Sequence, residues 1–163
     1  MYSVKIRKGR KEDIKSVHQL IRELAIYEKA EHEHTASEEV LLENCFGENA
    51  FVDFFVAENK SNEIVGIALF YYKYSTWKGK CVFLEDLIVS EKHRQNGIGK
   101  LLLDTLIKKA QKEDLKRIEW QVLKWNTPAI KFYEKYNTTF DDEWLNCQLD
   151  EKGISKALGF YKK

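Results

Sequence analysis

The chain has 163 residues and a formal net charge of +1, with 27 lysines and arginines against 26 aspartates and glutamates. This length suits one compact unit, so we expect residues 1–163 to form a single domain. The near balance of charge excludes a basic field that would draw the protein to nucleic acid or an anionic membrane, and no apolar run reaches membrane-spanning length. Cys45, Cys81 and Cys147 are not closely spaced and no signal peptide is evident, which predicts reduced thiols in the cytoplasm.

The first elements follow from two different spacings of apolar residues. Residues 2–7 alternate, with Val4 and Ile6 on one face, which predicts a short strand. A helix is expected next, with Asp13 near its start and Tyr27 at its end. Its apolar stripe recurs at helical spacing and consists of Ile14, Val17, Leu20, Ile21, Leu24 and Ala25.

The segment after this helix, residues 28–34, loses the helical spacing and gathers carboxylates and imidazoles. One interpretation is a solvated loop, because runs of charged residues usually face water. The other interpretation is an acidic lip that holds a cationic substrate. A metal site is disfavoured, because His32 and His34 would not share a helix face and no cysteine cluster completes a ligand set.

A second helix and a hairpin are expected next. Ser37 can cap a helix over residues 37–44, and Phe46-Gly47 ends it. Residues 51–58 and 64–74 are typical of the two arms of an antiparallel hairpin with a polar turn between them. Aromatic side chains crowd the second arm, and we expect them in the core and rim of a sheet: Phe70, Tyr71, Tyr72 and Tyr74, followed by Trp77.

Residues 82–89 form an almost continuous apolar strand that Glu85 and Asp86 interrupt. Adjacent residues of a strand point to opposite faces, so only one of the two carboxylates is expected to face a given cleft. Carboxylates in a buried strand need partners or water. They are therefore interpreted either as members of structural ion pairs or as functional groups.

This strand leads into residues 94–99, where Gly97 and Gly99 precede a leucine-rich helix. A helix start leaves backbone N–H groups without partners and carries a partial positive charge, so it can bind a phosphate or pyrophosphate. The two glycines lack a Cβ atom that would block such a ligand. An ordinary loop is the alternative. The apolar face of the helix consists of Leu102, Leu103, Leu106, Ile107 and Ala110.

A strand and a short helix are expected after the leucine-rich helix. Residues 117–123 have the alternation of a strand. The helix has Asn126 or Thr127 as its N-cap and Pro128 at its first position. Asn137 can end this helix in the left-handed conformation.

The last part of the chain is expected to contain strands and then a fraying helix. Residues 140–149 have the composition of one or two final strands. The tail, residues 150–163, is expected to form a short helix with Lys162 and Lys163 solvated at its end.

The order strand, Arg94-x-x-Gly97-x-Gly99, helix, strand, and then Asn126-x-x-Ala129-x-x-Phe132-Tyr133 resembles the GNAT superfamily of acetyl-CoA-dependent N-acetyltransferases. The resemblance implies an α/β (α+β) GNAT acyltransferase fold, with a mixed, mostly antiparallel twisted sheet flanked by helices. Further motifs resemble the diamine acetyltransferase family, and Ser75-Thr76-Trp77-Lys78-Gly79 is similar to its thialysine N-epsilon-acetyltransferase branch. These further motifs are Arg22-Glu23-Leu24-Ala25-x-Tyr27-Glu28, Phe46-Gly47, Leu84-Glu85-Asp86 and Val122-Leu123-x-Trp125-Asn126.

The resemblance implies acetyl-CoA as the co-substrate and no metal. The backbone of residues 87–89 would pair with the pantetheine arm as an extra strand would. The pyrophosphate would lie over residues 95–100, and Asn126 would bond the pantetheine or a helix end. The cofactor-binding residues implied in this way are Leu87, Ile88, Val89, Arg94, Gln95, Asn96, Gly97, Ile98, Gly99, Lys100, Asn126 and Ala129.

The resemblance also implies two catalytic residues and an amine pocket. Tyr133 would donate a proton to the departing CoA thiolate, and Glu85 would accept one from the substrate amine, which attacks the thioester directly in a ternary complex. In the family a second subunit completes the pocket, so a homodimer is expected. The substrate-binding residues implied are Tyr27, Glu28, Glu85, Asp142, Glu143 and Trp144.

Several functions remain as alternatives at this point. The preferred substrate is a small amine such as thialysine or a related lysine analogue, with a polyamine as the second choice. A noncatalytic acyl-CoA-binding module would keep the anion-binding helix start, but the presence of both Tyr133 and Glu85 argues against it. Acetylation of peptide or protein amines needs an open groove, which an acidic lip closed by a partner subunit would oppose.

Overall fold

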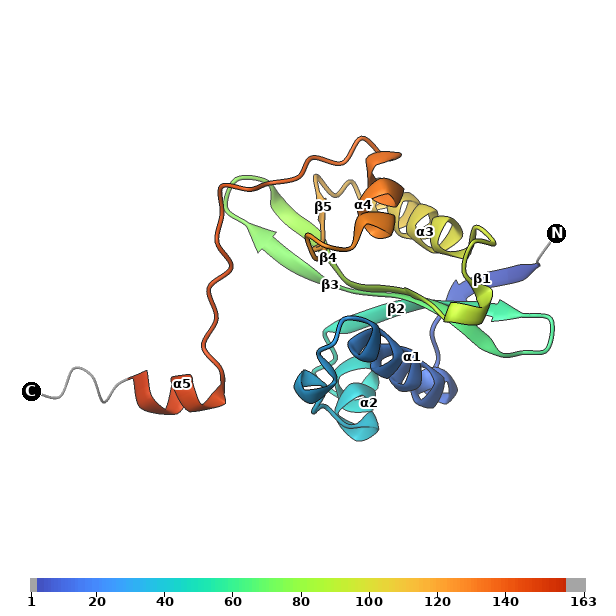
Figure 1. Ribbon diagram of the computed structural model, residues 1–163, viewed down its shortest axis with the longest axis horizontal. Helices are drawn as coiled ribbons and strands as arrows, with labels where there is room; N and C mark the ends of the chain where they lie inside the picture. Colours follow the sequence, from blue (N-terminus) through green and yellow to red (C-terminus); the bar gives the residue numbers. More distant parts are fainter. Residues whose placement is uncertain (1–2, 158–163) are drawn as a thin grey trace, which may run out of the picture. The chain divides into compact units, whose positions relative to one another are not determined.

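A five-stranded sheet organises the first of two units into which the chain divides, one up to Gln121 and one from Val122 onward. The computed structural model describes residues 3–157. The strands lie in the order β1 to β5 and are antiparallel, except that β5 runs parallel to β4 (Figure 1). This confirms the mixed, mostly antiparallel sheet. The strands are β1 Val4–Lys8, β2 Val52–Asn59, β3 Ile64–Ser75, β4 Gly79–Val89 and β5 Ile118–Glu119.

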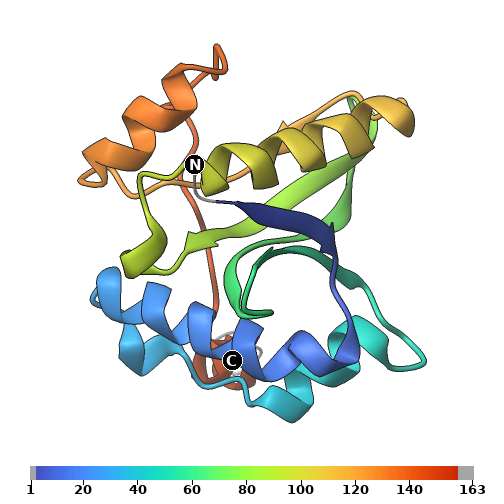
Figure 2. The ribbon, with the colours of Figure 1, turned by 90° about the vertical axis from the view of Figure 1, so that its right-hand side faces the viewer.

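Helices α1 (Ile14–Tyr27) and α2 (Glu38–Phe46) cover one face of this sheet, and α3 (Ile98–Lys112) covers the other (Figures 1 and 2). The predicted stripe of α1 is confirmed, because its central apolar residues are buried against the strands. Ser37 caps α2 by accepting the N–H of Val40 at 3.4 Å, also as predicted. The buried cluster on this face consists of Ile14, Val17, Leu20, Phe54, Val56, Ile67, Leu69 and Ile88.

The opposite face of the sheet packs against the leucine-rich side of α3. A close approach between helix and sheet depends on Gly66 of β3, where a Cβ atom would lie 3.2 Å from Leu102 Cδ1 and 2.9 Å from the carbonyl oxygen of Ile88. Phe70 is fully buried in the sheet, whereas Tyr74 and Trp77 are exposed at the far end of the β3–β4 hairpin. The predicted stripe of α3 is confirmed by the burial of Leu102, Leu103, Leu106 and Ala110.

Strand β5 is much shorter than the predicted strand over residues 117–123. It pairs with β4 only through Ile118 and Glu119, which lie opposite Val82 and Phe83. A strand persists only while a neighbour accepts and donates its ladder hydrogen bonds. The alternation of apolar residues in 117–123 was therefore not sufficient to define the length of the strand.

The second unit contains α4 (Thr127–Glu134) and α5 (Glu151–Ala157). The side-chain oxygen of Asn126 accepts the N–H of Ala129 at 3.3 Å, which confirms the predicted N-cap of α4 with Pro128 in its first turn. Asn137 has a φ of 53° after the helix, as predicted for a left-handed residue.

The prediction of one or two strands within residues 140–149 is wrong. These residues, all in the described part of the chain, belong to no strand, and Trp144 and Leu145 are 73% and 88% exposed. An extended segment becomes a strand only beside a sheet edge, and no strand pairs with this one in the chain as described. The tail does begin with the short helix α5, whereas Lys162 and Lys163 lie outside the described residues.

Candidate active site

A β-bulge at Glu85 changes the faces to which the carboxylates of β4 point. Phe70 of β3 pairs with Leu84, whereas Leu69 pairs with Asp86, so Glu85 is the extra residue of β4. Residues opposite each other on paired strands share a face. Because Leu69 belongs to the core cluster on the α1 face, Asp86 also points to that face. The simple alternation expected along this strand is therefore interrupted at the bulge.

Three carboxylates, those of Glu28, Glu85 and Asp86, form what we call the acidic cluster. Burial and the negative charges of Glu85 and Glu28 raise the pKa of Asp86 to about 7. Burial also raises the pKa of Glu28. None of the three forms an ion pair with a lysine, arginine or histidine among the described residues. The interpretation of Glu85 and Asp86 as members of structural ion pairs is therefore wrong for the described residues.

Aromatic side chains of β3 and β4 border the acidic cluster. The ring of Tyr71 lies 5.4 Å from that of Phe83, centroid to centroid. Burial, and then the charge of Glu85 and hydrogen bonding to it, raise the pKa of Tyr71, so this phenol remains a neutral donor beside a carboxylate. The aromatic pattern of the sequence predicts Tyr71 only in the core and rim of the sheet. Its proximity to Glu85 follows from the strand register and the bulge, which the sequence pattern did not contain.

The edge of β4 that does not face β3 is open over half of the strand. Strand β5 covers only Val82 and Phe83 on this edge. From Leu84 to Val89, no strand among the described residues lies beside it. An edge of this kind can pair with the amide groups of an extended ligand.

The hydrogen bonds at the end of β4 establish which backbone groups point to the open edge. The N–H of Ser90 donates to the carbonyl of Val65 at 3.0 Å, which turns the Val89 carbonyl away from β3, because the C=O and N–H of a trans peptide point in opposite directions. By the alternation of an antiparallel ladder, the N–H and C=O of Leu87 point the same way, whereas those of Ile88 face β3. Of residues 87–89, Ile88 therefore does not offer its backbone at this edge.

The start of α3 has unpaired backbone N–H groups. The N–H of Leu101 donates to the carbonyl of Gly97 at 3.1 Å, whereas the N–H groups of residues 95–100 find no acceptor in the described part of the chain. Gly97 has a φ of 78°, which favours glycine, and a Cβ atom there would meet nothing within 4 Å. At Gly99 a Cβ atom would make only an ordinary contact with Val89, at 3.8 Å. This geometry suits an anion such as a pyrophosphate.

Two side chains hold the loop that precedes α3. Arg94 donates from Nε to the carbonyl of Val89 at 3.0 Å, and its Cζ lies 4.8 Å from the centroid of the Tyr27 ring. Asn96 donates from Nδ2 to the carbonyls of His93 and Arg94, both at 3.1 Å. Tyr27, which was expected at the amine, and Arg94, which was expected at the cofactor, are thus in direct contact.

The charged segment after α1 divides into two parts. Glu28 is half-buried and contributes to the acidic cluster. The short helix η2 (Glu31–Glu33) is exposed, and Glu31 forms an ion pair with Arg22 at 2.9 Å. The solvated interpretation therefore suits η2, whereas Glu28 has the position expected of an acidic lip.

The second unit holds the remaining residues of the expected site. Tyr133, on α4, is buried, and its ring lies 5.2 Å from that of Phe132. Asp142, Glu143 and Trp144 are exposed and lie in the segment that has no strands. The carboxylate of Asp142 lies 3.7 Å from the ammonium of Lys124, and both side chains are mostly exposed.

The first unit therefore offers three kinds of chemical contact. An open edge can bond amides, a helix start can bond a diphosphate, and the acidic cluster can attract a cation and accept a proton. Within residues 3–157, no group of three or more histidine, cysteine, aspartate and glutamate side chains is arranged to hold a metal ion. None of the helices in that range is long and apolar enough to cross a membrane.

Comparison with known proteins identifies the family. Residues 15–137 match the Acetyltransferase (GNAT) family. The thialysine N-epsilon-acetyltransferases of Mus musculus and Sus scrofa are 32% and 36% identical to this chain over 169 aligned residues, covering 98% of this chain and 99% of each relative. A solved integron cassette protein from the mobile metagenome of V. cholerae shares the fold, with a TM-score of 0.78 at 24% identity over 97% of this chain and 99% of that protein. The chain therefore belongs to the acetyltransferase (GNAT) family and is an N-acetyltransferase.

Proposed function

We propose that this enzyme transfers the acetyl group of acetyl-CoA to a small amine, with thialysine or a related lysine analogue as the first choice and a polyamine as the second. One observation carries the proposal: an open strand edge leads to a helix start whose N–H groups are unpaired, in the same unit as carboxylates without a cationic partner, both counted within residues 3–157. The likeness to the mouse and pig thialysine enzymes supports the choice of amine. We treat residues 1–163 as one domain, because the family match extends across both units.

The cofactor-binding part of the proposal rests on the backbone. Acetyl-CoA supplies an activated thioester, and its pantetheine arm carries amides that Leu87 and Val89 can bond at the open edge of β4. Its pyrophosphate would be held by the N–H groups of residues 95–100, where Gly97 leaves room. Asn126 and Ala129, which form the cap of α4, would support the start of the helix that carries Tyr133.

The amine-activating part of the proposal rests on the acidic cluster. An ammonium group with a pKa of about 10.4 has no nucleophilic lone pair until it loses a proton. Glu85 is exposed at the bulge, and we assign it as the acceptor of that proton, directly or through a water. Asp86 and Glu28 stabilise the cationic substrate by their charge, and Tyr27 adds an aromatic face.

Tyr133 is proposed as the proton donor that completes the reaction. The amine nitrogen attacks the thioester carbonyl, the carbon–sulfur bond breaks, and the thiolate takes the phenolic proton. The second proton that the new amide nitrogen must lose then restores the phenol, directly or through water. We expect Tyr133→Phe to lower turnover at least about tenfold with little change in acetyl-CoA affinity. Unchanged turnover would remove Tyr133 from the chemistry and leave it as a core aromatic residue.

We also propose a homodimer in which the segment after α4 completes the amine pocket of the other subunit. This segment exposes Phe140, Trp144, Leu145 and Leu149, and in the described chain it has no strand partner. Apolar side chains on an extended segment favour association with a second surface. Asp142, Glu143 and Trp144 would then contribute to substrate binding. Sedimentation of the full chain as a monomer at micromolar concentration would contradict this proposal.

The cysteines support a reducing location for the enzyme. All three are free, with Cys81 buried and Cys147 exposed. Burial and the charge of Asp53 raise the pKa of Cys45 to about 11, so that side chain is a neutral thiol. We therefore propose the cytoplasm, where exposed thiols remain reduced.

Two other functions would use the same fold in different ways. A noncatalytic acyl-CoA-binding module needs the helix start but has no use for an unpaired acidic cluster, which costs stability. An acetyltransferase for peptide or protein amines needs a groove that accepts a backbone. The acidic cluster favours a small cationic amine over both.

The test is release of CoA from acetyl-CoA by the purified protein, detected through the free thiol of CoA. Because Cys147 is an exposed thiol that would react with the same reagent, the acetylated amine is also detected by mass spectrometry. The panel contains thialysine, lysine, spermidine, spermine, putrescine and a peptide with a free N-terminus. Saturation at the lowest concentration with thialysine would support the first choice, and the opposite order would favour the polyamine branch. Binding of acetyl-CoA without any acetylated product would favour the binding module.

A further inference from the structure

The side chain of Arg94 joins three elements that belong to different parts of the proposed site. Its backbone begins the loop that leads to the unpaired N–H groups of α3. Its Nε donates to the carbonyl of Val89, the last residue of β4, at 3.0 Å. Its Cζ lies 4.8 Å from the ring centroid of Tyr27, the last residue of α1, within the range of a cation–π contact.

The end of α1 that Arg94 contacts leads directly to the acidic cluster. Glu28, the next residue, donates its N–H to the carbonyl of Leu24 at 2.8 Å, and its charge raises the pKa of Asp86. Lys29 then has a φ of 60°, a left-handed conformation that is unfavourable for a residue with a side chain. The N–H groups of Lys29 and Ala30 close the helix end by donating to the carbonyls of Ile26 and Ala25, at 3.1 and 2.8 Å, so Glu28 belongs to the same ordered helix end as Tyr27.

We propose that Arg94 is a positioning residue that couples the two ligand sites, so that a diphosphate on the N–H groups of residues 95–100 strengthens amine binding at the end of α1. The identity of the two ligands rests on the function proposed above. Arg94 would act without touching the amine, through Tyr27 and the helix end that carries Glu28.

The physical reason is that one rigid group is shared by both sites. A diphosphate bound by the backbone of residues 95–100 restricts the loop in which Arg94 lies. The guanidinium is planar and is already fixed at Nε by the Val89 carbonyl, so restricting the loop also restricts the contact with Tyr27. Such coupling is reciprocal, and the amine must therefore strengthen CoA binding by the same factor.

Three variants separate this coupling from a simple role in CoA binding. Arg94→Gln removes the cation but keeps a donor of hydrogen bonds. Tyr27→Phe keeps the ring under the guanidinium, whereas Tyr27→Leu removes it. Lys92→Gln is the matched control, because it removes an exposed cation two residues before Arg94, in the short helix Glu91–His93, that makes no contact with Tyr27.

The first measurement uses calorimetric binding of thialysine with and without CoA, which cannot react. The coupling factor is the ratio of the two dissociation constants, and we expect about two- to fivefold tighter binding with CoA in the wild type, from the strength of a cation–π contact at an exposed site. Tyr27→Phe and Lys92→Gln should keep this factor. Arg94→Gln and Tyr27→Leu should reduce it to about one, and combining them should reduce it no further.

The second measurement does not depend on an amine or on activity. Hydrogen exchange of the Glu28 N–H should become slower when CoA is added to the wild-type protein, and it should not change in Arg94→Gln at CoA concentrations that saturate both proteins.

The outcomes separate the coupling from the proposed function. If the wild type acetylates thialysine but CoA changes neither thialysine affinity nor exchange at Glu28, the coupling is wrong and the function stands. If Arg94→Gln weakens only CoA binding and keeps the coupling factor, Arg94 is a cofactor residue and the coupling is again wrong. If the wild type does not bind CoA at all, both proposals fail.

Discussion

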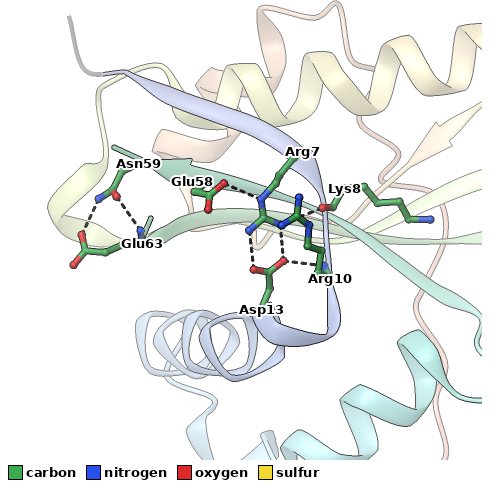
Figure 3. A network of polar contacts seen from close by, with 7 residues as sticks. All are labelled: Arg7, Lys8, Arg10, Asp13, Glu58, Asn59 and Glu63. Atoms are coloured by element: carbon green, nitrogen blue, oxygen red, sulfur yellow. Dashed lines mark hydrogen bonds and ion pairs between the residues drawn. The ribbon is translucent and has the colours of Figure 1, made fainter. Parts of the chain in front are cut away.

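Two regions of the first unit hold carboxylates that are partly or fully buried. In one region the carboxylates are paired with an arginine, and in the other they are not. In the polar network of Figure 3, Asp13 accepts hydrogen bonds from Arg7 at 2.7 and 2.8 Å and from the N–H of Arg10 at 2.8 Å. Arg7 also donates to Glu58 at 2.8 Å. In the acidic cluster, no lysine, arginine or histidine of the described residues pairs with a carboxylate.

The pKa values of the two regions differ in direction for this reason. Burial alone would raise the pKa of Asp13, but the hydrogen bonds from Arg7 and from the Arg10 N–H, with the charge of Arg7, lower it. In the acidic cluster, burial and neighbouring negative charge raise the pKa of Asp86 to about 7. The first arrangement joins β1, β2 and the start of α1 and stabilises the fold. The second opposes folding at neutral pH, as is typical of groups retained for a reaction.

The largest change is expected from Arg7→Met, which keeps an apolar stem but removes the guanidinium. Asp13, whose side chain is 8% exposed, would then be a buried carboxylate without its cation. Breaking a buried pair in this way costs about 3–5 kcal/mol of the free energy of unfolding. Urea unfolding followed by circular dichroism at pH 7 measures the loss.

Arg10→Met is the matched control for this prediction, because the Arg10 side chain is exposed and its backbone N–H still bonds Asp13. We expect it to change the free energy of unfolding by less than about 0.5 kcal/mol.

The stability that Asp13 adds also depends on pH. Since the folded-state pKa of Asp13 is lowered, its contribution to the free energy of unfolding is present above about pH 3.9 and is lost as pH falls below that value. Equal urea midpoints for the two variants would mean that the network does not hold the fold together.

The second prediction concerns the acidic cluster and is expected to change activity. Glu85→Gln removes the proposed proton acceptor with almost no change of shape, so we expect turnover to fall about a hundredfold. The remaining activity should shift to higher pH, because more of the amine must then be deprotonated by solvent. The pH dependence of kcat for thialysine acetylation measures both effects.

Glu48→Gln provides a matched control, since Glu48 is an exposed carboxylate outside the site. It should leave turnover and its pH dependence unchanged. A Glu85→Gln profile that coincides with the wild-type profile would exclude Glu85 as the base and direct attention to Asp86.

The elements of the fold were largely predictable because their signals are local. Stripes at helical spacing define α1 and α3, and Ser37, Asn126 and Pro128 mark helix starts through their own side chains. The length of β5 and the absence of strands in residues 140–149 were not predictable in this way. Both depend on whether another strand lies alongside, which is a property of the assembled sheet.

The candidate site was predictable where backbone geometry follows from residue type. Gly97 indicates a positive φ and an open helix start, and both are present. The arrangement around Asp86 was not predictable, because it depends on the bulge at Glu85 and on Glu28 approaching from the end of α1. Likewise, the contact between Arg94 and Tyr27 joins residues far apart in the sequence. Motifs identified both residues but gave no indication that they touch.

The third prediction is that Asp86→Asn stabilises the protein above neutral pH while it lowers activity. The folded-state pKa of Asp86 is raised to about 7, so this group makes the folded state lose stability as pH rises from about 4 to about 7, and the loss is complete above that range. Asparagine carries no charge and removes the loss. Because Asp86 is only half-buried, we expect a gain of about 1–2 kcal/mol at pH 8 and none at pH 4. Urea unfolding at the two pH values tests this, and a destabilised variant at pH 8 would contradict it.

The smallest effect is expected from Lys8→Met, which tests whether exposure separates strong from weak ion pairs around the same strand. Lys8 lies next to Arg7 in β1 and pairs with Asp53 at 3.1 Å, but the two side chains are 69% and 32% exposed. Water and counterions screen such a pair, so its removal should cost only about 0.5 kcal/mol at 0.1 M salt and less at about 1 M salt. The loss in Arg7→Met should hardly depend on salt, because its charges are shielded from counterions. If both losses fell equally with salt, burial would not be what distinguishes the network of Figure 3 from the surface.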